Sequence, residues 1–194
     1  MPIDPVKYLI LANAAGFLIS AVNGRLQQKN RRGIPVLTAA SALLGGSLGA
    51  AVAAPLFGGK AKKDNMLLRV FLYALLTVHV LLLLAGKGFL KRDLTFDLIG
   101  FFRARPSLLI FLAAINAAAF FVYGLDKRRA RMNRRRVPIV TLLTLAAAGG
   151  SVGSLAAMYI FRHKTQKSYF TLGVPLILMV QLLLLFFVMN LRLP

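Results

Sequence analysis

Four long apolar runs constrain what this chain can fold into, and they cover residues 8–22, 67–85, 108–125 and 172–190. Each is close in length to the roughly 17 to 25 residues that a helix needs to cross the hydrocarbon core of a bilayer. Hydrophobic residues make up 58% of the chain and its mean hydropathy is +0.72, whereas soluble domains contain about 45–50% apolar residues. The sequence therefore predicts an all-α integral membrane protein.

The chain also contains an internal duplication. The segment "NAAGFLISAVNGRLQQKNRRGIPVLT" (13–38) aligns without a gap with "NAAAFFVYGLDKRRARMNRRRVPIVT" (116–141). After one additional residue in the second copy, "GGSLGAAVAAPLFGGKAKK" (45–63) aligns with "GGSVGSLAAMYIFRHKTQK" (149–167). We expect the first apolar run to be a retained helix rather than a signal peptide, because its counterpart is internal.

The duplication sets the expected domain boundaries. Residues 1–86 form a first membrane repeat, residues 107–194 form a second, and residues 87–106 join them as a basic linker. Apolar residues recur every four positions in that linker, beside charged ones, which is typical of an amphipathic helix at a membrane surface. The recurring positions are Leu90, Leu94, Leu98 and Phe102.

The order of segments leaves two membrane topologies open. Each copy reads as an apolar helix, a basic loop, a Gly-centred apolar segment, a second basic loop and a final apolar helix. If every segment spans, the chain has about six crossings, and the odd number per copy makes the copies an inverted repeat. If the Gly-centred segments re-enter instead, four crossings remain and both basic loops of each copy share the cytoplasmic face. Spanning is the preferred prediction, and re-entry is the alternative.

Glycine spacing bears on this choice. Gly45 with Gly49, and Gly149 with Gly153, are pairs of small residues four positions apart. A continuous helix uses such pairs to pack closely on a neighbour. Irregular backbone at the same glycines would instead fit a segment that enters the membrane and returns.

Isolated polar residues within the apolar runs are expected to form hydrogen bonds. Asn13 and Asn116 occupy equivalent places in the first helix of each copy, where an amide facing lipid would be costly. We predict that they bond between helices at the interface of the repeats. His79 and Gln181 are predicted to have similar packing roles rather than to relay protons.

The second copy carries motifs of a known family. The segment "YGLDKRRARMNRRRVP", followed by "AGGSVGSLAAMYIFRHKT", resembles the small bacterial membrane family called domain of unknown function 1294. The resemblance covers residues 107–190, and residues 7–86 share it only as a degenerate duplicate. It implies a multi-pass protein of the bacterial inner (cytoplasmic) membrane, with no settled activity. Relatives usually carry a glutamate where this chain has Ile139, and some look fused to a cold-shock-type nucleic-acid-binding domain.

The copies differ at their specialised polar positions. In the first copy, Asn23 replaces the acid of the basic loop, and two glycines replace the Arg-His pair after the Gly-centred segment. Joint loss is expected if these residues form one ligand site that only the second copy needs. The alternative is that the acid ends a helix beside cations and that the basic cluster is an interfacial anchor. The candidate site residues are Asp126, Lys127, Arg162, His163 and Lys164.

Charge indicates the partners. The chain has 25 Lys and Arg against 5 Asp and Glu, which favours contact with phosphate on lipid, nucleic acid or solute. We expect the lipid bilayer and anionic lipid headgroups as partners, with nucleic acid as a further candidate. The predicted contact residues are Arg128, Arg131, Arg134, Arg135 and Arg136.

Two classes of function follow. The first is transport or permeation of a small solute or anion through the two halves, and the second is a membrane-bound binding or scaffold protein that uses its basic loops. No enzyme activity, metal or cofactor is predicted, since the chain lacks cysteine and has few acids. A Ser151 nucleophile with His163 as its base is disfavoured, because both copies keep the serine and only one keeps a histidine.

Overall fold

The computed structural model describes residues 4–29, 32–58 and 65–192, and within these ranges the chain is mostly helical and forms no strand. Its contacts divide the chain into two compact units, one up to Leu83 and one from Leu84 onward. The linker predicted at residues 87–106 falls in the second unit.

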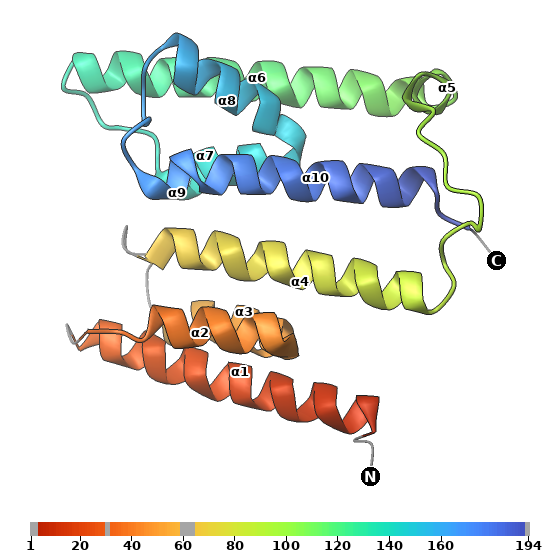
Figure 1. Ribbon diagram of the computed structural model, residues 1–194. Helices are drawn as coiled ribbons and strands as arrows, with labels where there is room; N and C mark the ends of the chain where they lie inside the picture. Colours follow the sequence, from red (N-terminus) through yellow and green to blue (C-terminus); the bar gives the residue numbers. More distant parts are fainter. Residues whose placement is uncertain (1–3, 30–31, 59–64, 193–194) are drawn as a thin grey trace. The chain divides into compact units, whose positions relative to one another are not determined.

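The first unit contains two long helices and a bent helical segment between them (Figure 1). Prolines at the first turn start α1 and α2, where a missing N–H leaves no helical bond unmade. Asp4 caps α1 by accepting a hydrogen bond from the Val6 N–H at 3.0 Å. The elements in chain order are α1 (Pro5–Gln28), α2 (Pro35–Ser41), the π-helical turn η1 (Ala42–Gly46), α3 (Ser47–Phe57) and α4 (Met66–Gly86).

The second unit has the same order of elements after its linker (Figure 1). A long helix is followed by a bent pair and then by a final apolar helix. The elements are α5 (Leu98–Arg103), α6 (Pro106–Arg131), α7 (Ile139–Leu145), the π-helical turn η3 (Ala146–Gly150), α8 (Ser151–Ile160), α9 (Ser168–Thr171) and α10 (Gly173–Met189).

Six helical segments in the described part of the chain are long and apolar enough to cross a membrane, judged by length and composition. Four of them are α1, α4, α6 and the segment of α9 and α10. The other two are the Gly-centred segments, Pro35–Phe57 and Ile139–Ile160. These two differ from the rest in their backbone.

Each Gly-centred segment bends sharply at its first glycine. Gly45 has φ +98° and Gly149 has φ +117°, within the left-handed region that favours glycine. At these points the helix axis changes direction, so that α8 runs back from the end of α7 (Figure 1). The continuous close-packed helix preferred from the glycine spacing is therefore not what these segments form.

The ends of each bent segment confirm that it folds back. In the second unit, the Val137 N–H before α7 and the His163 ring after α8 both bond to the carboxylate of Asp126, each at 2.9 Å. In the first unit, the Ile34 N–H before α2 bonds to Asn23 at 2.7 Å, and a Cβ at Gly24 of α1 would lie 2.6 Å from the Phe57 carbonyl at the end of α3. A straight helix of that length would hold its ends about 33 Å apart. Each Gly-centred segment therefore forms a helical hairpin that returns toward the end of the long helix where it began.

Asparagine side chains support the bends from the neighbouring long helix. Asn116 Oδ1 accepts from the Gly153 N–H at 2.7 Å, and its Nδ2 donates to Gly149 O at 2.9 Å. Asn13 Oδ1 likewise accepts from the Gly49 N–H at 3.0 Å. The predicted interhelical hydrogen bonds exist, but each lies within its own unit. They satisfy backbone groups that the start of a helix leaves unpaired.

Gly49 and Gly153 allow this close approach. A Cβ at Gly49 would lie 1.9 Å from Asn13 O, and one at Gly153 would lie 2.0 Å from Asn116 O. The second glycine of each pair therefore packs against the long helix. The first glycine of each pair makes the bend instead.

The linker is less helical than its period of four predicts. Only Leu98–Arg103 forms a helix, and Asp97 caps it by accepting from the Gly100 N–H at 2.8 Å. Residues before it are held by Asn190, which is fully buried and exchanges hydrogen bonds with the Thr95 backbone at 2.7 and 3.1 Å. Hydrogen bonds to the end of α10 therefore replace a surface helix over much of the linker.

Candidate functional site

Asp126 is the centre of the candidate site, near the carboxyl-terminal end of α6. Its side chain is fully buried. One carboxylate oxygen accepts from the Val137 N–H, and the other contacts His163 Nε2 at 2.9 Å and Lys164 Nζ at 3.1 Å. A buried carboxylate needs such partners, because its charge is poorly stabilised without them. Asp126 thus fastens both ends of the bent segment to α6.

The end of α8 directs these two basic side chains toward the carboxylate. The Arg162 N–H donates to Tyr159 O at 3.2 Å and the His163 N–H donates to Met158 O at 3.0 Å, which is the Schellman pattern of a helix terminus. Arg162 occupies its left-handed position with φ 44°, where glycine is usual. Lys164 also has a positive φ, of 66°. Backbone strain of this kind tends to gather at functional sites.

Aromatic residues close the site on its inner side. The Lys164 ammonium lies 4.9 Å from the ring centroid of Phe170, an arrangement that favours a cation. Phe170 meets the buried ring of Tyr123 edge to face at 5.9 Å. The side chains of His163 and Lys164 keep only 14% and 12% of their surface exposed. The carboxylate and its two partners therefore form a compact, nearly closed cluster.

The structure brings together three of the five candidate site residues. Asp126, His163 and Lys164 are in direct contact, whereas Arg162 is exposed and Lys127 is half-buried on α6. The five arginines predicted to contact anions are all exposed beyond or at the end of α6. They are Arg128, Arg131, Arg134, Arg135 and Arg136.

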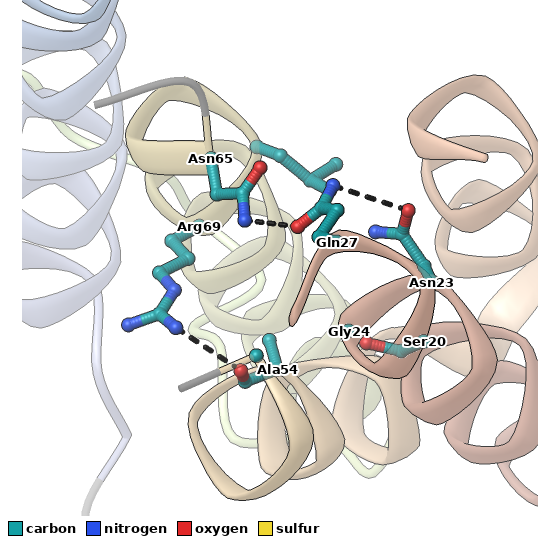
Figure 2. A pocket seen from close by; sticks show the side chains of 9 residues that line it. Ser20, Asn23, Gly24, Gln27, Ala54, Asn65 and Arg69 are labelled. Carbon is teal, nitrogen blue, oxygen red and sulfur yellow. Dashed lines mark hydrogen bonds between the residues drawn. The ribbon is translucent and has the colours of Figure 1, made fainter. Parts of the chain in front are cut away.

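The first unit holds its bent segment differently. Asn23 takes the place of Asp126 and still accepts from the loop backbone, through Oδ1 and the Ile34 N–H. Gln27 Nε2 donates to the same oxygen at 3.2 Å. The counterpart of His163, Gly59, lies outside the described residues, as do Lys60 and Lys63. A pocket lies beside Asn23, between α1, α3 and α4 (Figure 2).

Two polar residues of the final helices support the bends. Gln181 Nε2 donates to Ala146 O at 2.7 Å and to Ala147 O at 3.0 Å, and its oxygen meets the Ser151 hydroxyl. His79 Nδ1 lies 2.8 Å from the Oγ of Ser47, the counterpart of that serine. Both residues make packing hydrogen bonds, as predicted from sequence.

Some structural partners had no signal in the sequence. The buried Asn190 looked like an ordinary helix end, and the Val137 N–H could not be assigned as a donor to Asp126 before the loop path was known. The Ser151–His163 pair does not form, because Ser151 begins α8, His163 follows its end, and the helix between them rises about 14 Å. The serine bonds Gln181 and the histidine bonds Asp126.

Comparison with known proteins agrees with these motifs. The family model described as "Protein of unknown function (DUF1294)" matches residues 116–170, which include Asp126, the bend and the Arg-His-Lys cluster. An uncharacterized protein of Bacillus subtilis (strain 168), YsdA, is 37% identical over 75 residues, covering 39% of this chain and 84% of that protein. The chain belongs to the DUF1294 family. The DUF1294 match therefore spans the site in the second unit, and no solved structure matches the chain.

Proposed function

We propose that this protein is an integral membrane protein built from two duplicated units, each with two crossing helices and one re-entrant hairpin. The equivalent glycine bends, asparagine bridges and loop contacts in the two units support the duplication. The bend at Gly149 lies beside Leu112 and Ile115 of α6. Along α6, Ile115 and Leu112 lie roughly 16 to 21 Å from Asp126. The hairpin therefore reaches less deep than the roughly 30 Å thickness of a hydrocarbon core.

This arrangement gives each unit an even number of crossings. In each unit the final helix starts at the end where the long helix stops, since Asn65 bonds Gln27 and Lys164 packs on Phe170. Two crossings per unit is an even number, so the second unit enters from the same side as the first. The duplication is then a parallel repeat rather than an inverted one, and the basic loops at residues 127–136 and 162–167 lie on the cytoplasmic face.

The function that this geometry supports best is binding of anionic phospholipid headgroups on that face. The observation that carries it is the meeting of two basic loops at Asp126. Residues 127–136 and 162–167 carry ten lysines and arginines, and the acid at their meeting point is Asp126. An exposed arginine can donate two parallel hydrogen bonds to two oxygens of one phosphate. A basic residue near an anionic surface contributes about 1 kcal/mol to membrane attraction.

In this proposal the ionic cluster has a positioning role. Asp126 neutralises Lys164 and ties the second loop to the first, and the exposed arginines of both loops then face the same layer of headgroups. The bilayer and its anionic lipids are thus the proposed partners. Nucleic acid offers the same phosphate chemistry, and it is an outcome of the test below.

Transport has less support. A polar path through the membrane needs unsatisfied polar groups near its middle. The candidates, Asn13, Asn116, His79 and Gln181, instead bond to the bends of their own units.

The test compares lipid selectivity in the full-length protein. We expect spin-labelled phosphatidylglycerol to associate more than spin-labelled phosphatidylcholine, with a preference that falls as salt rises. Replacing Arg134, Arg135 and Arg136 by Gln should remove most of the preference. The matched control replaces Lys87, Lys91 and Arg92 of the linker by Gln, which removes the same number of positive charges. Equal loss in both triple variants would overturn the assignment to this face. Salt-dependent oligonucleotide binding without lipid selectivity would assign the face to nucleic acid instead.

A further inference from the structure

The pocket in the first unit is lined by side chains that are smaller than their counterparts in the second unit. Ser20 stands where the second copy has the buried Tyr123, and Ala54 stands where it has the buried Met158. Gly58 replaces Arg162. Smaller side chains at these places leave a space for a group of roughly one water's size.

Polar groups surround that space. Asn65 bonds Gln27, and the Arg69 guanidinium reaches across to Ala54 O at 3.2 Å (Figure 2). Gly58 makes room for this reach, since a Cβ there would lie 2.9 Å from an Arg69 nitrogen. Continuing the register of the duplication pairs Arg69 with Gly173. The two units have therefore exchanged the places of arginine and glycine at this end.

One hydrogen-bond donor in the pocket makes no bond to the described residues. Asn23 is only 4% exposed, and its Oδ1 accepts from Ile34 and Gln27. Its Nδ2 donates to none of the residues in the described ranges, and Figure 2 shows this nitrogen pointing into the ring of lining residues. The Asn23 amide nitrogen therefore faces the pocket, and an acceptor atom seated there would receive a hydrogen bond from it.

We infer that this pocket binds one oxygen of a phosphate group, from a lipid headgroup or from free phosphate. The Asn23 amide donates to that oxygen, and the neighbouring Arg69 guanidinium favours its negative charge. The lipid source rests on the proposed function, whereas the pocket itself lies in the other unit from the arginine loops. The first unit is then a separate phosphate site, built where the second unit uses an internal carboxylate.

Side-chain amide NMR of the full-length protein tests this inference. The Asn23 Nδ2 resonances, assigned by their absence in Asn23→Asp, should shift on titration with inorganic phosphate, with phosphatidylglycerol nanodiscs, or with both. A shift with nanodiscs alone assigns the lipid source, and a shift with phosphate alone assigns free phosphate. Comparison with phosphatidylcholine nanodiscs controls for the bilayer.

Two variants make the test specific. Ala54→Met places the second copy's side chain in the pocket and should weaken the titrated affinity at least about tenfold, the loss expected for one hydrogen bond to a charged acceptor. Ala85→Met, at the far end of α4, should leave it unchanged. An Asn23 amide that responds to neither probe, or responds equally in Ala54→Met, overturns the inference and leaves a site for water. This result is independent of the lipid selectivity measured on the arginine loops.

Discussion

At the residue scale, two non-glycine residues in the left-handed region flank His163. Arg162 and Lys164 adopt positive φ, and only Lys164 gains a direct ionic partner from it. Arg162 is exposed at a position where glycine terminates helices more easily. No contact within the described unit therefore offsets the backbone strain at Arg162. This agrees with the proposal that the Arg162 side chain contacts anionic headgroups.

This contrast predicts opposite effects for two similar substitutions. Arg162→Gly should leave stability unchanged or raise it by up to about 1 kcal/mol, because it relieves a left-handed side chain. Lys164→Gly relieves the same kind of strain but should destabilise the protein, since it removes the ionic partner of Asp126. Unfolding in mixed micelles by titrated SDS measures both. A loss of stability in Arg162→Gly equal to that in Lys164→Gly would show that Arg162 has a structural role.

The stability lost on substitution of Asp126 should increase with the number of contacts that the substitution removes. Asp126→Ala leaves Lys164 and the Val137 N–H without their acceptor and should cost about 3–5 kcal/mol. Asp126→Asn should cost less, since an amide oxygen can still accept from the loop, as Asn23 does from Ile34. The same SDS titration ranks the two variants. Equal losses would mean that the backbone contact contributes little.

At the element scale, the sequence predicted the long helices, the matching order of segments and the interhelical hydrogen bonds of Asn13 and Asn116. It did not decide the path of the Gly-centred segments. Glycines four residues apart are compatible with both a closely packed helix and a bend. The sequence does not indicate that Gly149 adopts a positive φ. Asp126, Arg162 and His163 could be proposed as one site from their joint loss in the first copy, whereas Lys164 keeps its lysine there as Lys60. The contact of Asp126 with His163 and Lys164 depended on a fold-back that only the structure shows.

The two glycines of a pair should therefore respond to substitution for different reasons. Gly149→Ala should cost about 1–2 kcal/mol, because alanine is strained at φ +117°. Gly153→Ala should cost more, since its Cβ would lie 2.0 Å from the Asn116 backbone oxygen and α8 must move away from α6. Thermal unfolding in detergent compares them. A milder effect at Gly153 than at Gly149 would place the close contact of α6 and α8 in doubt.

At the scale of the whole molecule, the account depends on the basic loops at residues 127–136 and 162–167 sharing one membrane face, with the linker on the other. The chain has no cysteine, so single cysteines can be introduced at Asn133, Gln166 and Asp93 without background labelling. These positions lie in the two basic loops of the second unit and in the linker. All three residues are exposed in the described structure.

Labelling these cysteines with a membrane-impermeant thiol reagent tests the central claim most directly. We expect the Asn133→Cys and Gln166→Cys proteins to be labelled in inside-out vesicles and protected in intact cells, and Asp93→Cys to show the reverse. Labelling after membrane disruption confirms that each thiol can react. Labelling of Asn133→Cys and Gln166→Cys from opposite sides would contradict the re-entrant hairpin and the shared cationic face.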